Sequence, residues 1–183
     1  MKILIISLLF SISLNVIGQK AVELKTRPLN KDIKKRFKHT EYQKKIIPAD
    51  DLTHRMGVYY TLSSGDTTFG YLYAGRVNSC RTGGCSIEQN DVNDGSFEYF
   101  DYYVLFNLKK EVVNVRVFNY QATHGQEVSA QSWLKQFRGY DGDTELQVGK
   151  GIDAISGATI SVYAITVDIE YISKTLKRLK TTF

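Results

Sequence analysis

Residues 149–161 combine small side chains with hydroxyl groups immediately before a long amphipathic stretch. Small residues allow a bulky group to approach the backbone closely. The first amides of a helix have no acceptor within the helix, and together with the positive end of the helix dipole they form a site for an anion such as a phosphate. The pattern therefore indicates phosphate binding at a helix start. The alternative is simple N-capping by Ser156 or Thr159, with Asp153 offsetting the dipole.

Residues 153–159, Asp-Ala-Ile-Ser-Gly-Ala-Thr, resemble the flavinylation signature of the FMN-binding domain family. That family includes the C subunit of the sodium-translocating NADH:quinone reductase and the G subunit of the Rnf complex. The resemblance implies that FMN is joined through a phosphoester to Thr159, and that Asp153 belongs to the signature read by a flavin transferase. The residues that it implies for close approach of the cofactor are Ser156, Gly157 and Ala158.

Other features of the family are found between residues 56 and 180. These are Gly70-Tyr71 at the start of a strand, a strand pair over 97–120, Thr123-His124-Gly125 and Phe137-Arg138-Gly139. The resemblance implies that Thr123, His124 and Gly125 lie near the flavin. His124 could donate to the reduced flavin or carry a proton, because imidazole titrates near neutral pH; a loop histidine without such a role is the alternative.

Cys80 and Cys85 form an even pair separated by a glycine-rich segment. A disulfide is expected if the chain is exported to an oxidising compartment, since such a segment can bend enough to close the bond. A dithiol that exchanges electrons with the flavin is an alternative, because the adjacent Arg81 could lower a thiol pKa. A zinc site lacks further ligands at short spacing.

The elements that must position these residues follow from the pattern of the chain. Residues 57–62 and 67–73 predict a hairpin, and residues 97–108 and 112–120 predict a second one, because aromatic and β-branched residues alternate around short turns. Residues 74–96 are expected to form a loop. A short helix is expected from Ser129 to Arg138 and a long one from about Thr159 to Lys180. The predicted fold class is α+β, an antiparallel sheet of hairpins backed by helices.

The N-terminus predicts export. Lys2 precedes an apolar run over 3–16 and the small residue Gly18, which is typical of a secretory signal peptide and shorter than a membrane-spanning helix. The expected organisation is a signal peptide over 1–18, a linker and basic surface helix over 19–55, and an FMN-binding domain over 56–183. Within the second part, Asn30 is the expected N-cap of a helix that runs through Lys45. The expected location is the periplasm.

Charge is distributed unevenly along the chain. The formal net charge is +5, but residues 20–45 hold ten Lys or Arg against three acids, whereas residues 46–183 hold thirteen against sixteen. A basic segment in an exported protein could meet anionic lipid headgroups or an acidic redox partner, and it does not indicate nucleic-acid binding. A solvated helix face is the alternative.

Three functions remain open from the sequence. The preferred one is an electron carrier whose partners are membrane or periplasmic electron-transfer proteins, with a flavin transferase for maturation. The second is a non-redox periplasmic binding or adaptor domain that kept the fold. The third is a flavin reductase that acts on a small acceptor, although no acid or base constellation for a substrate is evident in the sequence.

Overall fold

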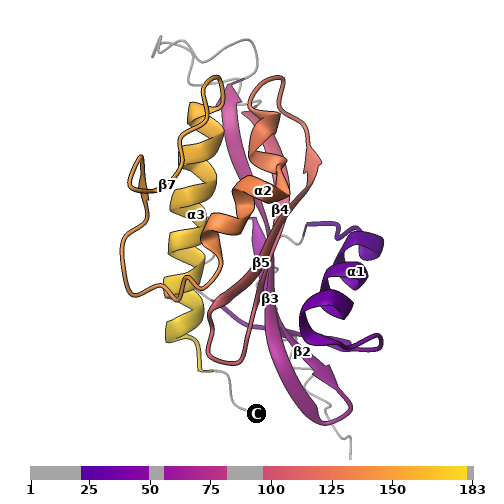
Figure 1. Ribbon diagram of the computed structural model, residues 1–183. Coiled ribbons are helices and arrows are strands. Elements are labelled where there is room, and N and C mark those ends of the chain that lie inside the picture. The colour runs from indigo at the N-terminus through magenta and orange to yellow at the C-terminus, as the bar shows by residue number, and fades with distance from the viewer. Residues whose placement is uncertain (1–21, 50–55, 82–96, 181–183) are drawn as a thin grey trace, which may run out of the picture.

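The computed structural model describes residues 22–49, 56–81 and 97–180. Five antiparallel strands form the central sheet in the order β1-β2-β3-β4-β5. They are β1 (Gln43–Ile47), β2 (Gly57–Ser64), β3 (Thr67–Arg81), β4 (Phe97–Phe106) and β5 (Val112–Tyr120). Helices cover both faces, so the predicted α+β class is confirmed (Figure 1).

One face of the sheet carries the C-terminal helices. The long helix α3 (Thr159–Arg178) lies along this face beside η2 (Gln126–Ser129), α2 (Gln131–Leu134) and η3 (Lys135–Phe137). Two short strands, β6 (Gln147–Val148) and β7 (Gly151–Ile152), lead into α3. The core on this face includes Tyr73, Phe100, Trp133, Phe137 and Ile165.

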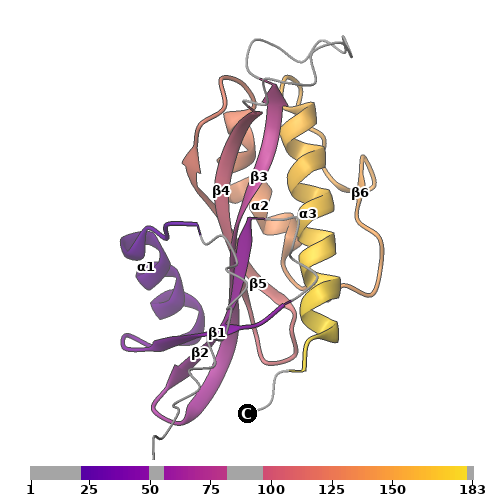
Figure 2. The same cartoon turned by 180° about the vertical axis from the view of Figure 1, so that it is seen from behind.

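The other face is covered by α1 (Thr26–Phe37), which lies opposite α3 (Figure 2). Leu29 and Ile33 are fully buried against Leu72, Tyr103 and Leu105. Successive residues of a strand point to opposite faces, so β3 and β4 supply apolar side chains to both cores. This explains why these strands are apolar and aromatic almost throughout, instead of alternating with polar residues.

Both hairpins and the final helix lie where the sequence predicts them, whereas the N-terminal helix was predicted wrongly. It begins at Thr26, not after Asn30, because a proline such as Pro28 is tolerated in the first turn. It ends at Phe37, where Lys38 adopts the left-handed conformation and its amide donates to the Lys34 carbonyl.

Further bounds also differ from the sequence predictions. Residues 43–47 form the edge strand β1, which pairs with β2, instead of the end of the N-terminal helix. The expected loop 74–96 begins later, because β3 continues to Arg81 and pairs with β4. Ser129 does not cap the short helix, whose N-cap is Ala130. Within the described residues, no helix is long and apolar enough to cross a membrane.

Candidate functional site

The first turn of α3 has free backbone donors. Ala158 is the N-cap residue, and no side chain caps the helix, so the capping alternative for Ser156 and Thr159 is wrong. Val162 makes the first helical bond, donating its amide to the Ala158 carbonyl over 2.9 Å. The amides before Val162 therefore have no acceptor within the helix and can bind an anion.

A tight turn precedes this helix start. The Ala158 amide donates to the Ile155 carbonyl over 3.1 Å, and Gly157 has a φ of 79°, a conformation that favours glycine. Ser156, Gly157 and Thr159 are exposed, whereas Ala158 is 2% exposed. Ala158 thus fixes the turn to the core while the hydroxyl groups on either side remain accessible.

Asp153 holds the motif through its backbone. Its amide donates to the Gln136 side chain over 2.7 Å, and its carbonyl accepts from the Trp133 indole over 2.9 Å. Trp133 packs edge to face on Phe137, so both rings belong to the core and support this loop. Asp153 is exposed.

Thr159 lines a cleft of about 800 Å³ between α3 and β3. This is within the size range of pockets that hold small-molecule ligands and cofactors. One wall is formed by α3 and the other by Met56 and β3. The lining residues are Met56, Arg76, Val77, Asn78, Thr159, Ile160, Tyr163, Ala164, Val167 and Asp168.

Arg76 supplies a fixed cation to this cleft. Its Nε and Nη2 atoms donate to Asp101 at 2.7 and 3.1 Å, and its guanidinium lies 3.5 Å from the centroid of the Tyr99 ring. The hydrogen bond to Asp101 raises the pKa of Arg76. Asp101 also accepts from the Asn119 side chain over 2.7 Å, so the carboxylate is held in place from both sides.

A second carboxylate, Asp168, lies in the cleft wall on α3. It is 4% exposed and accepts a hydrogen bond of 2.5 Å from the Tyr102 hydroxyl. The Tyr59 hydroxyl donates to the Ile172 carbonyl one turn further along. These tyrosines from β2 and β4 fix the position of α3 relative to the sheet.

The predicted loop of Thr123, His124 and Gly125 contacts the same helix start. Gly125 has a φ of 85°, and a Cβ atom added there would lie 2.6 Å from the Ser161 hydroxyl. Ser161 is 2% exposed and its hydroxyl lies 2.8 Å from that of Ser79 and 3.1 Å from that of Tyr120. The loop is therefore packed against the first turn of α3.

The hydrogen bonds of His124 and Thr123 show how this loop is held. The Tyr120 hydroxyl donates to the His124 carbonyl over 2.6 Å, and the His124 side chain is exposed. The amide and hydroxyl of Thr123 both donate to Glu98. None of these three residues is part of the cleft lining, so their contact with a flavin stays a prediction.

The sequence did not identify Arg76, Asp101 or Asp168 as part of the site. The available signal was a charged residue within an apolar or aromatic run, as at Asp101 in β4 and Asp168 in α3. Cys80 lies in β3, but its side chain and Cys85 are outside the described residues, so the disulfide stays a prediction.

Comparison with models of known protein families identifies part of the chain. Residues 100–172 match the family model of the FMN-binding domain, from within β4 to within α3, and this segment includes Thr159. Residues 100–172 therefore resemble an FMN-binding domain, and the resemblance to this family is confirmed. This match supports a flavin-binding protein. The closer resemblance to the two respiratory subunits stays a prediction. A search of the curated proteins found no match.

Proposed function

We propose that this protein is an exported electron carrier with FMN attached covalently to Thr159. It would pass electrons between a membrane or periplasmic donor and an acceptor. The observation that carries the proposal is the position of Thr159: it is exposed, it lies at an uncapped helix start and it lines the cleft. The match to the FMN-binding domain family supports FMN as the cofactor.

The helix start suits the phosphate of FMN. A phosphodiester keeps one negative charge, which the free amides and the positive end of the α3 dipole can stabilise without a lysine. Ser161 is an unsuitable attachment site, because its hydroxyl is buried and lies within hydrogen-bond distance of Ser79 and Tyr120. Ser156 is exposed and is the remaining alternative.

The cleft suits the ring system of FMN. Ile160, Tyr163 and Val167 offer an apolar wall with 41%, 52% and 58% of their surface exposed, and Arg76 and Asn78 offer hydrogen-bond donors. Bound flavin supplies the capacity to accept and release one or two electrons. The chain's own residues hold the ring, limit its contact with water and leave one side open to partners.

Attachment requires a separate flavin transferase. Among the described residues, no histidine or carboxylate is hydrogen bonded to the Thr159 hydroxyl, which is a weak nucleophile without a base. The Thr159 oxygen has to displace a leaving group from an activated flavin phosphate and lose its proton. The transferase has to supply both the activated flavin and the base.

Covalent attachment would prevent loss of the flavin after export, because a carrier outside the cytoplasm cannot regain a flavin that dissociates. The signal peptide, the periplasmic location and a membrane-surface contact through residues 20–45 are parts of the same proposal. The exposed basic residues of α1 and β1, which include Lys31, Lys34, Lys35, Lys44 and Lys45, support that contact or one with an acidic redox partner.

The test is flavinylation of the full chain, produced with a flavin transferase and directed to the periplasm. The wild-type band should remain fluorescent after denaturing electrophoresis, because a phosphoester survives unfolding. Thr159→Ala should lose the fluorescence, and the matched variant Ser156→Ala should keep it. Fluorescence that persists in Thr159→Ala would contradict the attachment site, and a wild-type chain without flavin would favour the non-redox adaptor.

A further inference from the structure

A cluster of charged side chains lies between α1 and β5, on the other face of the sheet from the helix start of α3. Its centre is Asp32, which is 4% exposed and accepts hydrogen bonds from Tyr103, Asn114 and Arg116. Arg116 makes two of these bonds, at 2.6 and 2.9 Å, and forms a salt bridge with Asp32. The carboxylate of this cluster is therefore already paired with Arg116.

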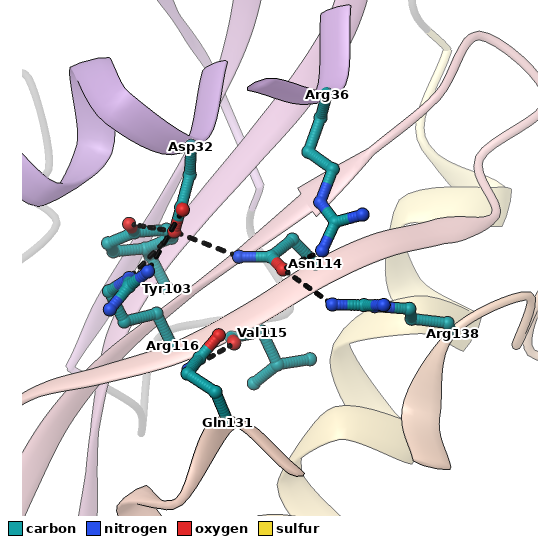
Figure 3. A network of polar contacts seen from close by, with 8 residues as sticks. All are labelled: Asp32, Arg36, Tyr103, Asn114, Val115, Arg116, Gln131 and Arg138. Atoms are coloured by element: carbon teal, nitrogen blue, oxygen red, sulfur yellow. Dashed lines mark hydrogen bonds and ion pairs between the residues drawn. The ribbon is translucent and has the colours of Figure 1, made fainter. Parts of the chain in front are cut away.

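Two further arginines converge on this cluster from different elements (Figure 3). Arg36 extends from α1 and Arg138 from the residue after η3, and the Nη2 atoms of both donate to the Oδ1 atom of Asn114, at 3.1 and 3.4 Å. Two cations therefore share one neutral amide oxygen. Asn114 cannot accept more hydrogen bonds, because its amide oxygen has two lone pairs and its amide nitrogen is only a donor, which here donates to Asp32.

The donors of these arginines exceed the acceptors around them. Among the described residues, neither Arg36 nor Arg138 forms a salt bridge, and the buried Nε atom of each has no hydrogen-bond partner. Three guanidinium groups face one carboxylate. Burial and the charge of Arg36 lower the pKa of Arg138, as expected for like charges held close together. Such an excess is costly unless an anion compensates it.

We infer that Arg36 and Arg138 form a binding site for a phosphate group, either free phosphate or the headgroup of an anionic phospholipid. A carboxylate has two oxygens in one plane and its shape matches one guanidinium group, as in the two bonds between Asp32 and Arg116. A phosphate has oxygens on several sides, so two guanidinium groups from different elements can each bind it. Both arginine side chains are partly exposed, which leaves them accessible.

This site is independent of the flavin, because it uses residues of α1, β5 and the segment after η3. Binding would join α1 to the rest of the domain, since Arg36 is on α1 and Arg138 follows η3. A ligand that binds only the folded state raises its stability. Phosphate should therefore raise the thermal midpoint of the full chain, even in protein made without flavin.

The experiment measures the Tm of the flavin-free full chain in phosphate and in chloride at equal ionic strength. We expect a saturable rise of a few °C in wild type and in Lys109→Gln, an exposed control in the turn between β4 and β5, and its loss in Arg36→Gln and Arg138→Gln. Vesicles of phosphatidylcholine, alone or with equal phosphatidylglycerol, test the headgroup. The protein could bind the mixed vesicles but show no response to free phosphate. If both arginine variants then lose the vesicle binding, the ligand is the lipid headgroup.

Other outcomes would overturn the inference. They are no response to either ligand, an unchanged response in both arginine variants, or an equal loss in Lys109→Gln, which would indicate general screening of charge. If the glutamine variants do not fold, Arg138→Lys replaces them, because lysine keeps the positive charge but lacks the parallel N–H donors of a guanidinium group. Wild type should then broaden the phosphorus NMR signal of phosphate or vesicles more than Arg138→Lys does, and equal broadening would overturn the site.

Discussion

The hydroxyl of Tyr102 in β4 donates a 2.5 Å hydrogen bond to the carboxylate of Asp168 in α3, and both residues are buried. This bond joins the sheet to the helix that begins at Thr159. A hydrogen bond to a charged group contributes about 1.5–3 kcal/mol, and a buried carboxylate that loses a donor is costly. The Tyr102–Asp168 pair should therefore stabilise the wall of the cleft.

Tyr102→Phe should lower the free energy of unfolding by about 1.5–3 kcal/mol. Combining it with Asp168→Asn should cost less than the sum of the two single variants, because both changes disrupt the same hydrogen bond. Urea unfolding measures all three variants. Tyr163→Phe, on the exposed side of α3, is the control and should change stability by less than about 0.5 kcal/mol. Additive single effects would contradict this role.

Gly125→Ala should destabilise the helix start of α3. Alanine is strained at a φ of 85°, and its Cβ atom would meet the Ser161 hydroxyl at 2.6 Å. Gly139 offers a matched control, because its φ is 82° and no atom lies within 4 Å of an added Cβ atom. Gly139→Ala should show only the backbone cost, about 1–2 kcal/mol. Equal urea midpoints for the two variants would contradict the contact.

Asp32 should make stability depend on pH in the acid range. Burial raises the pKa of Asp32, but hydrogen bonds from Arg116 and Tyr103 and the charges of Arg116 and Arg36 outweigh it, so its pKa is lowered from the ordinary value of a carboxyl group in the folded state. The stabilisation is therefore complete above the unfolded pKa and is lost as pH falls through the folded pKa.

Asp32→Asn should lower stability at pH 7 and flatten the decline below about pH 4. Urea unfolding at several pH values measures both effects. Asp66→Asn, in the exposed turn between β2 and β3, is the control and should keep the wild-type profile. A decline of unchanged steepness in Asp32→Asn would show that other groups govern the acid limb.

Reduction kinetics should separate the carrier from a flavin reductase. No glycine-rich dinucleotide motif follows a strand in the sequence, so NADH alone should reduce the flavin slowly, whereas a protein or membrane donor should reduce it fast. Stopped-flow absorbance of the flavinylated full chain measures this. Rapid, saturable reduction by NADH without a partner would contradict the carrier and favour the enzyme.

Local sequence patterns predicted the helices and strands that depend mainly on residues nearby in the chain. The hairpin turns and the apolar stripe of α3 are visible in the sequence, and Thr159 lies at the helix start as expected. The strand β1 was missed because Gln43–Ile47 is polar for most of its length and becomes a strand only through pairing with β2. Tertiary pairing overrides the local preference there.

The polar residues of the cleft were missed for a similar reason. Arg76 and Asp101 lie directly opposite each other in the register of β3 and β4, but the segment between the two strands is long, so the sequence does not reveal that register. Asp168 meets Tyr102 only after α3 has packed on the sheet. Pairs that depend on register or helix docking are not visible from spacing along the chain.

The placement of helices on both faces of the sheet has a kinetic consequence. The basic helix α1 and the cleft beside α3 lie on opposite sides, so a surface or protein bound at α1 leaves the cleft uncovered (Figures 1 and 2). If the proposed carrier function holds, a donor and an acceptor could bind at the same time without competing for one surface. The proposal then predicts a ternary-complex rate law instead of a mechanism in which each partner has to leave before the next one binds.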